Sequence, residues 1–234
     1  MSEFKWRHFS GEIILQCVRW YCKYGISYRD LEEMMAERGI PVDHTTLYRW
    51  VQRYAPELEK RICWYQGYTS ASWRVDETYV KVKGKWKYLY RARAIDKHGR
   101  LIDFFLSDRR NAKAAKRFLG KALRTRKDWP PLKINTDKND AYPPAIRELK
   151  QQGKLVPDVE HRQVKYLNNR LEADHGGLKR LIKPTRGFQS MKTAYATIKG
   201  FEVMRMLRKR QCILLEPGIA GEMRFVNKLF GLLA

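Results

Sequence analysis

The sequence predicts an α/β fold that follows a separate all-α segment. From residue 74 on, three stretches with the two-residue periodicity of strands are followed by alternating helical and strand patterns, whereas residues 1–62 show helical periodicity alone. This order is typical of a sheet covered by helices. With 234 residues, 44% of them hydrophobic, the chain can bury a core and is long enough for one large domain and a small one.

Three helices are predicted within residues 1–62, the segment expected to form a helix-turn-helix domain. The first covers residues 11–24, the second starts at the capping-box sequence of residues 27–30, and the third follows Asp43, a good N-cap. We expect Pro56 to disturb the third helix near its end. A tight turn before the third helix is typical of DNA-binding units, although a plain three-helix bundle is the alternative. The residues free to reach DNA would be His44, Thr45, Thr46, Arg49 and Arg53.

The charge balance favours nucleic acid as the partner. The chain has 48 Lys and Arg against 25 Asp and Glu, a formal net charge of +23 spread along its length, and such a surface binds polyanions. No apolar run approaches the roughly 20 residues of a membrane span, and charges interrupt the N-terminus where a signal peptide would be apolar. We therefore expect no membrane partner and a cytoplasmic protein that is nucleoid-associated when bound to DNA. The four cysteines form no CxxC pair, which argues against zinc or disulfides.

Residues 74–212 are predicted to form the α/β domain, joined to the first helices by a connector at residues 63–73. The expected strands and helices are, in chain order, strands 74–82, 86–95 and 101–106, helix 111–125, a short strand around Ile134, helix 142–152, a weak strand at 156–164, and helices 168–182 and 191–210. This is the order of a ribonuclease-H-like α/β domain. Residues 213–234 are expected to form a helical tail that folds onto the main domain or makes an oligomer contact.

Three carboxylates are predicted to form a metal site. Asp76 lies on the more apolar face of the first strand, where an unpaired carboxylate is costly unless it binds metal or does chemistry. Asp137 ends a short apolar run, and Glu172 opens a helical pattern. Together they would hold two Mg²⁺ ions, with Mn²⁺ as substitute, for phosphoryl transfer, Asp76 bridging both ions. Lys179, seven residues after Glu172, lies on nearly the same helix face and would contact a DNA phosphate, as would Arg180.

Other residues compete with this triad. Asp103, inside the third predicted strand, is the most serious rival. Glu77 follows the first carboxylate directly but points to the opposite face of the strand, and Asp174 lies roughly 200° around the helix from the third carboxylate. His161 and His175 are expected to be hydrogen-bonding structural residues rather than ligands. No GxxxxGK[ST] loop is present, so nucleotide hydrolysis is not indicated.

Five segments of the sequence carry a specific resemblance to a known family. These segments are residues 19–29, 46–51, 76–82, 135–137 and 192–200. Over nearly its whole length the chain resembles bacterial DDE transposases of the insertion-sequence-six family, of the insertion-sequence-twenty-six type. The spacing between Asp137 and Glu172 also matches that of the family's acidic triad.

The resemblance implies a magnesium-dependent DNA transposase with a retroviral-integrase-like catalytic domain. Its triad would be Asp76, Asp137 and Glu172, and its following basic residue Lys179. Such an enzyme binds terminal inverted repeats, frees a 3′ hydroxyl by hydrolysis and joins it to target DNA in replicative, cointegrate-forming transposition, as a homodimer or larger homo-oligomer. The alternatives are a catalytically inactive DNA-binding regulator derived from such an element, and a nuclease of the same fold without joining activity.

Two features depart from the family pattern. Residues 90–96 run two residues longer than the usual segment, which would preserve side-chain facing but could force a β-bulge or lengthen a turn. Asn139 and Asp140 stand where other residues were expected. They place an extra carboxylate near the site, which would weaken the approach of DNA.

Overall fold

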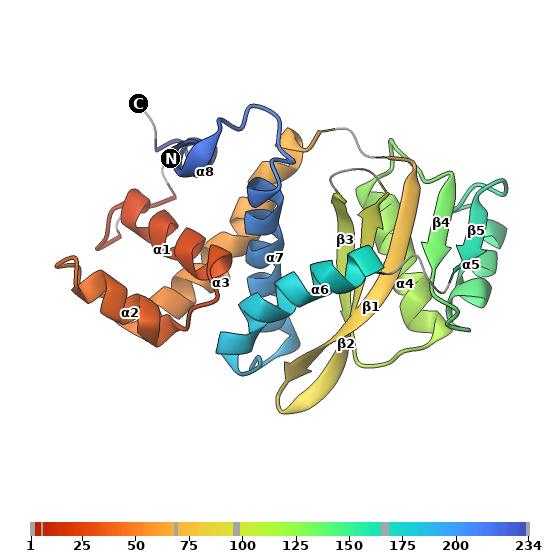
Figure 1. Cartoon of the computed structure of the whole chain (residues 1–234), viewed down its shortest axis with the longest axis horizontal. Coiled ribbons are helices and arrows are strands. Elements are labelled where there is room, and N and C mark those ends of the chain that lie inside the picture. The colour runs from red at the N-terminus through yellow and green to blue at the C-terminus, as the bar shows by residue number, and fades with distance from the viewer. Residues whose placement is uncertain (1–2, 6, 68–69, 96–98, 165–168, 233–234) are drawn as a thin grey trace. The chain divides into compact units, whose positions relative to one another are not determined.

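The computed structural model describes two compact units (Figure 1). The described residues are 3–5, 7–67, 70–95, 99–164 and 169–232, with only the backbone described for 169–174. One unit, the α/β unit, comprises residues 68–177; the other, the helical unit, comprises residues 1–67 and 178–234. The units differ from the predicted domains, because residues 178–212 group with the N-terminal helices instead of with the sheet.

The α/β unit is built on a five-stranded sheet with the order β3-β2-β1-β4-β5. Its strands are β1 (Ser72–Val82), β2 (Lys85–Ala94), β3 (Leu101–Ser107), β4 (Lys133–Thr136) and β5 (Glu160–Gln163). β1 pairs antiparallel with β2 and β2 with β3, whereas β4 lies parallel to β1 and β5 parallel to β4. Three antiparallel strands extended by two parallel ones form the predicted ribonuclease-H-like sheet, and that prediction is confirmed.

Two helices, α4 (Ala112–Thr125) and α5 (Tyr142–Gln151), pack against each other and cover the core of this unit (Figure 1). The Asn111 side chain accepts a hydrogen bond from the third residue of α4, while α5 has prolines in its first turn, where a missing N–H is harmless. The core includes Trp73 from β1 and Phe118 from α4. A third helix, α6 (Asn169–Ile182), runs without a break through its glycine pair.

The segment expected to be two residues longer includes the end of β2, whose register is regular on one side and shifts on the other. β2 keeps an unbroken register against β1 from Lys85 to Ala94, whereas its register against β3 shifts between Ala92 and Arg93. Ala92 pairs with Asp103 and Arg93 with Leu101, so the extra residue of this irregularity is Ile102 of β3 and not a residue of β2. The other expected accommodation, a longer turn, falls on residues 96–98, which lie outside the described residues. Because the irregularity lies away from β1, the strand that carries Asp76 stays regularly paired with β2.

The helical unit contains α1 (Gly11–Lys23), α2 (Tyr28–Ala36), α3 (His44–Ile62), α7 (Met191–Arg208) and α8 (Gly218–Leu229), with short 3₁₀ turns at Cys63–Tyr65 and Lys183–Thr185. α7 packs along α3 and α1 and buries residues around most of its circumference. A Cβ atom at Gly200 would lie 2.5 Å from Sγ of Cys22 and 2.8 Å from Cβ of Ala55. The glycine therefore lets the three helices approach closely.

The structure tests two expectations for the helical segments. α3 continues past Pro56 to Ile62, because burial of Ala55, Leu58 and Ile62 outweighs the one hydrogen bond that proline removes. The C-terminal helix α8 packs on its own chain, as one alternative held, and the helices it contacts are α1 and α3 of the helical unit. Its buried Glu222 is held by Nζ of Lys23 at 2.7 Å.

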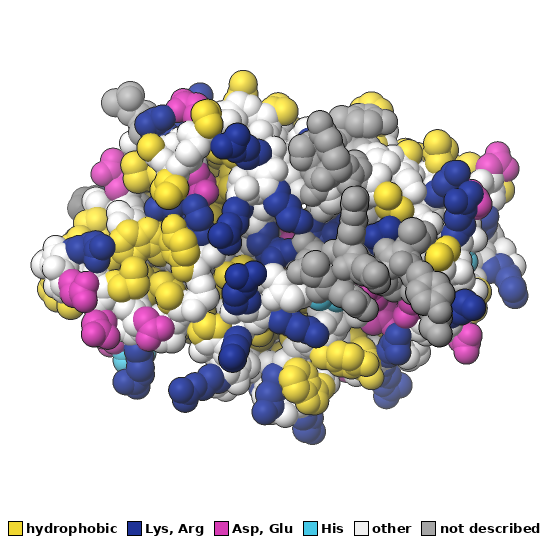
Figure 2. Space-filling model, viewed as in Figure 1, with side chains coloured by type: hydrophobic (Ala, Val, Ile, Leu, Met, Phe, Trp, Pro, Cys, Tyr) yellow, Lys and Arg dark blue, Asp and Glu magenta, His cyan; other side chains and the backbone are white. Residues whose placement is uncertain are grey.

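Three features of composition can be followed in the structure. Among the described residues, no helix is long and apolar enough to cross a membrane. Cys17 and Cys22 are buried, whereas Cys63 is exposed. Lys and Arg side chains are numerous on the face shown in Figure 2, over elements of both units.

Candidate functional site

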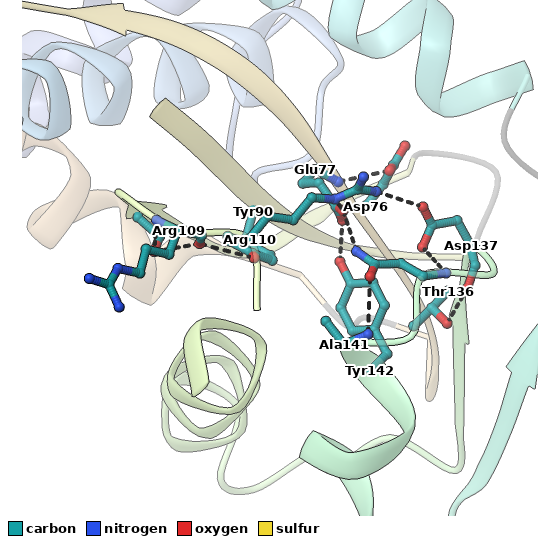
Figure 3. Close-up of polar contacts among 11 residues, drawn as sticks. Asp76, Glu77, Tyr90, Arg109, Arg110, Thr136, Asp137, Ala141 and Tyr142 are labelled. Carbon is teal, nitrogen blue, oxygen red and sulfur yellow. Dashed lines mark hydrogen bonds and ion pairs between the residues drawn. The ribbon is translucent and has the colours of Figure 1, made fainter. Parts of the chain in front are cut away.

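The carboxylates gather where β1 runs beyond its parallel neighbour. β4 pairs with β1 only from Ser72 to Arg74, so within the described part of the chain no strand pairs with this edge of β1 from Val75 on, and we call it the open edge. Asp76 lies two residues after Arg74, the last residue of β1 that pairs with β4, and Asp137 directly follows the last residue of β4. Asp76, Glu77 and Asp137 each offer a carboxylate oxygen, and these oxygens lie within 4.8 Å of one another (Figure 3). The structure therefore brings the two predicted aspartates of the triad together in the α/β unit.

The prediction that Glu77 points away from Asp76, to the opposite face of the strand, is wrong, because its carboxylate belongs to this cluster. Its side chain is only 3% exposed, and its oxygens accept hydrogen bonds from Nδ2 of Asn139 at 2.8 Å, from the hydroxyl of Tyr142 at 2.5 Å and from Nε of Arg110. Strand alternation places the Cβ atoms of neighbouring residues on opposite faces. At an open strand edge, however, the side-chain ends of two neighbouring residues can bend past the edge and lie close together, although their Cβ atoms are on opposite faces. Asp76 does so by accepting the backbone N–H of Glu77 at 2.7 Å.

Arg110 supplies the positive charge of the cluster. It lies between β3 and α4, and its guanidinium pairs with Glu77 through Nε and with Oδ2 of Asp137 through Nη2 at 3.3 Å. Figure 3 shows the guanidinium between the two carboxylates, while the side chain of Arg109 points away from them. The sequence did not predict Arg110 and Tyr142 in the site, because they come from the segment before α4 and from the start of α5. Asn139 was noted only as a departure from the family pattern. The one signal for Arg110 is an arginine pair just before the start of a helix.

Burial and crowding of negative charge govern the protonation of the cluster. Burial raises the pKa of Asp76 to about 6, and the charges of Glu77 and Asp137 add to the rise. Burial and the charge of Glu77 also raise the pKa of Asp137. Tyr142 has a pKa well above its usual value because of burial and the adjacent Glu77 carboxylate, so its hydroxyl remains a donor. Carboxylates that repel one another in this way gain from a bound cation.

The rivals of the triad have structural partners. Asp103 is buried on β3, where it accepts a hydrogen bond from Oγ1 of Thr125 at 2.8 Å and pairs with Lys121, so it links β3 to α4. Nε2 of His161 lies 2.9 Å from Oγ1 of Thr136, in the structural role expected of it, and burial lowers its pKa. His175 is a buried residue of α6, and Asp140 is exposed. The side chain of Asp174 lies outside the described residues.

The remaining triad residue stands on α6. The backbone of Glu172 belongs to the part of α6 in the α/β unit, and its side chain lies outside the described residues. Lys179 and Arg180 follow on the same helix as exposed residues, grouped with the helical unit. Their parts in the site therefore stay predictions.

The residues predicted to read DNA lie off the buried stripe of α3. Thr45, Arg49 and Arg53 are exposed, and Thr46 is half-buried. His44 is less free than predicted, because its Nδ1 lies 3.1 Å from a carboxylate oxygen of Glu32. Contact with DNA remains a prediction for all five.

A cavity of about 570 Å³ adjoins α2 and α3 in the helical unit. Tyr28 and Tyr48 line it together with Arg29 and Arg186. Aromatic rings and guanidinium groups side by side are the usual contacts of proteins with nucleic acid strands. His44, one of the five residues predicted to read DNA, also lines this cavity.

A ribonuclease-H-like sheet with one carboxylate in the middle of β1 and another directly after β4 is the architecture of metal-dependent polynucleotidyl transferases. A family model described as a DDE domain matches residues 70–211. The transposase for insertion sequence-like element IS431mec of Staphylococcus aureus is 40% identical over 212 residues, 90% of each chain. The transposase for insertion sequence element IS257 in transposon Tn4003, also from Staphylococcus aureus, is 39% identical over the same share. The chain belongs to the insertion-sequence-six family of DDE transposases, enzymes that use a divalent metal.

Solved structures resemble the chain more distantly. The HTLV-2 integrase catalytic core domain in complex with magnesium matches 58% of this chain and 86% of its own, with 17% identity and a TM-score of 0.43. The Mos1 strand transfer complex matches 87% of this chain and 61% of its own, with 14% identity and a TM-score of 0.40. The family assignment rests on the transposase sequences instead.

Proposed function

We propose that the protein is an active DNA transposase that frees a 3′ hydroxyl at the end of an insertion sequence and joins it to target DNA. The observation that carries this proposal is the convergence of the Asp76 and Asp137 carboxylates within 4.8 Å at the open edge of β1. Residues whose oxygen atoms lie this close can share one cation. By the resemblance to the family, the same two residues would be the first two acids of its triad.

The donor set fits Mg²⁺, with Mn²⁺ as substitute. Carboxylate oxygens are the hard ligands that Mg²⁺ prefers, and the ion needs few of them because it retains water and binds substrate phosphate. Asp76, Asp137 and Glu172 would hold two ions. When bound, a pair of ions about 3.5–4 Å apart activates the attacking oxygen and stabilises the leaving oxygen.

The other residues would position the DNA. Lys179 and Arg180 would contact phosphates, and the exposed face of α3 would read the terminal inverted repeats. Glu77 would be a positioning residue. It accepts hydrogen bonds from Arg110, Asn139 and Tyr142 and so holds these side chains beside the open strand edge. We expect replicative, cointegrate-forming transposition by a homodimer or larger homo-oligomer, because two DNA ends must be held at once, acting on nucleoid DNA in the bacterial cytoplasm.

A joining assay with Asp76→Asn tests this proposal. The purified variant should bind DNA ends as the unaltered protein does, and it should lose magnesium-dependent joining of a 3′ end to target DNA by at least a hundredfold, because asparagine removes the charge that holds the ion. Asp158→Asn, which removes an exposed carboxylate elsewhere in the same unit, should join normally.

Three outcomes would contradict the proposal. Undiminished joining by Asp76→Asn would remove Asp76 from the site. End binding without cutting or joining by the unaltered protein would favour a DNA-binding regulator. Cutting without joining, even when pre-cut ends are supplied, would favour a nuclease of the same fold.

A further inference from the structure

We propose that Arg110 couples metal binding to DNA binding: its guanidinium competes with the divalent ion for Asp137 while it stays paired with Glu77 and, once released from Asp137, binds a DNA phosphate. The inference rests on the proposed function, because it concerns the same carboxylates. It adds a positioning residue to the site that lies outside the acidic triad.

The contacts of Arg110 carry the first part of the proposal. Nη2 lies 3.3 Å from Oδ2 of Asp137, and Nε bonds Oε1 of Glu77. The carboxylate oxygens of Asp76, Glu77 and Asp137 fall within one 4.8 Å group (Figure 3). An ion that takes the oxygens of Asp76 and Asp137 would therefore stand beside the guanidinium. Two cations at neighbouring positions repel, so the ion and Arg110 oppose each other for Asp137.

The partners of Glu77 explain why Arg110 stays near the site. Glu77 is 3% exposed and is fixed by Asn139 and Tyr142, so it forms a rigid anchor for Nε of the guanidinium. Asp137 is more accessible, with 25% of its side chain exposed, and it is the partner that Arg110 can exchange. The guanidinium can therefore change one partner while it keeps the other.

The exposure of Arg110 carries the second part. Its side chain is 37% exposed, so it can reach a ligand in solvent, and a guanidinium forms paired hydrogen bonds with phosphate oxygens. A phosphate that draws Arg110 away from Asp137 makes that carboxylate available to the ion. DNA should then raise metal affinity, and metal should raise DNA affinity by the same factor.

Titration with Mn²⁺ alone, followed by the electron paramagnetic resonance signal of the free ion, tests the competition. Arg110→Gln should bind Mn²⁺ on the order of tenfold more tightly than the unaltered protein, because a unit positive charge beside the ion is lost. Arg109→Gln removes the same charge one residue earlier from a side chain that points away, and its Mn²⁺ affinity should be unchanged. Circular dichroism and thermal melting verify that each variant is folded.

Adding a duplex with a pre-cut 3′ end tests the coupling. DNA should raise the Mn²⁺ affinity of the unaltered protein and of Arg109→Gln, and it should raise that of Arg110→Gln much less. Arg110→Lys keeps the charge but loses the fork of the guanidinium. It should bind Mn²⁺ alone with the affinity of the unaltered protein and show weaker coupling to DNA, which provides a second test if the glutamine variant fails to fold.

Two results would overturn the inference. Equal or weaker Mn²⁺ binding by folded Arg110→Gln would exclude competition, and undiminished coupling in both Arg110 variants would exclude the phosphate contact. Failure of the unaltered protein to bind Mn²⁺, with or without DNA, is a different result. It would contradict the proposed function itself.

Discussion

Asp76 shows at the scale of one residue how a carboxylate proposed to be catalytic opposes the stability of the fold. Its pKa of about 6 in the folded chain lies above the ordinary value of 3.8, because burial and neighbouring negative charges penalise the ionised form. The folded state therefore binds more protons than the unfolded state between these two values. Stability should fall as the pH rises through this window and should then stay level.

Asp76→Asn is accordingly expected to stabilise the protein at pH 7 in the presence of EDTA, by roughly 1–3 kcal/mol. The gain should vanish below pH 4, where the aspartate is protonated. Urea unfolding at several pH values measures both effects. A variant that is less stable than the unaltered protein at pH 7 would show that the charge of Asp76 is stabilised rather than penalised.

Glu77 has the opposite effect on stability, because its buried carboxylate satisfies three donors. Glu77→Gln should lower the free energy of unfolding by about 1–3 kcal/mol, since it weakens the pairing with Arg110 and leaves donors without an acceptor. Glu148→Gln is the matched control, because that side chain is 50% exposed. It should change stability by less than about 0.5 kcal/mol. Equal effects of the two substitutions in urea unfolding would refute the anchoring role of Glu77.

At the scale of elements, the contact of α7 with α1 and α3 depends on a missing side chain. Gly200→Ala should destabilise the helical unit by about 1–3 kcal/mol, because the added methyl group would overlap Cys22 and Ala55. Gly120→Ala on α4 is the control: the nearest atom to its Cβ is Cδ2 of Leu149 at 3.7 Å. At position 120 the substitution should raise the free energy of unfolding by about 0.5–1 kcal/mol, because alanine has a higher helix propensity than glycine. Thermal melting of both variants compares them, and a stabilising Gly200→Ala would contradict the packing.

The elements were largely predictable because each has a local cause. Strand alternation and helix caps located all five strands and the helices within a few residues. The prediction that Pro56 disturbs α3 was wrong, because burial of the helical turn after the proline outweighs the one hydrogen bond that the proline removes. The partners of α7 were not predictable, because a helix that is apolar around most of its surface does not indicate which neighbour it contacts.

The site was predictable in part: the sequence identified two of its carboxylates but not the side chains around them. Asp76 and Asp137 could be paired from the order of the strands, because β1 and β4 are adjacent. The expectation that both lie at strand ends holds for Asp137 alone, since Asp76 lies in the interior of β1, just beyond its pairing with β4. Glu77 was misjudged because strand parity fixes the direction of Cβ but not the end of a longer side chain at an open edge. Arg110 and Tyr142 join the site through loop geometry that the sequence does not specify.

At the scale of the whole molecule, the helical unit is built from both ends of the chain. α7 and α8 supply much of the packing surface for α1 and α3. A fragment of residues 1–67 should therefore lack a cooperative thermal transition by circular dichroism, whereas the full chain should show one, because the fragment leaves its apolar faces uncovered. A fragment that melts cooperatively near the temperature of the full chain would contradict this dependence.

The most direct test of the central claim asks whether Asp137 touches the metal. Mg²⁺ requires hard oxygen ligands, whereas Mn²⁺ is the more tolerant of sulfur. With Asp137→Cys, joining of a pre-cut 3′ end to target DNA should fall below detection in Mg²⁺ and recover in part in Mn²⁺, while end binding is unchanged. Joining by Asp137→Cys at the unaltered rate in Mg²⁺ would contradict the account.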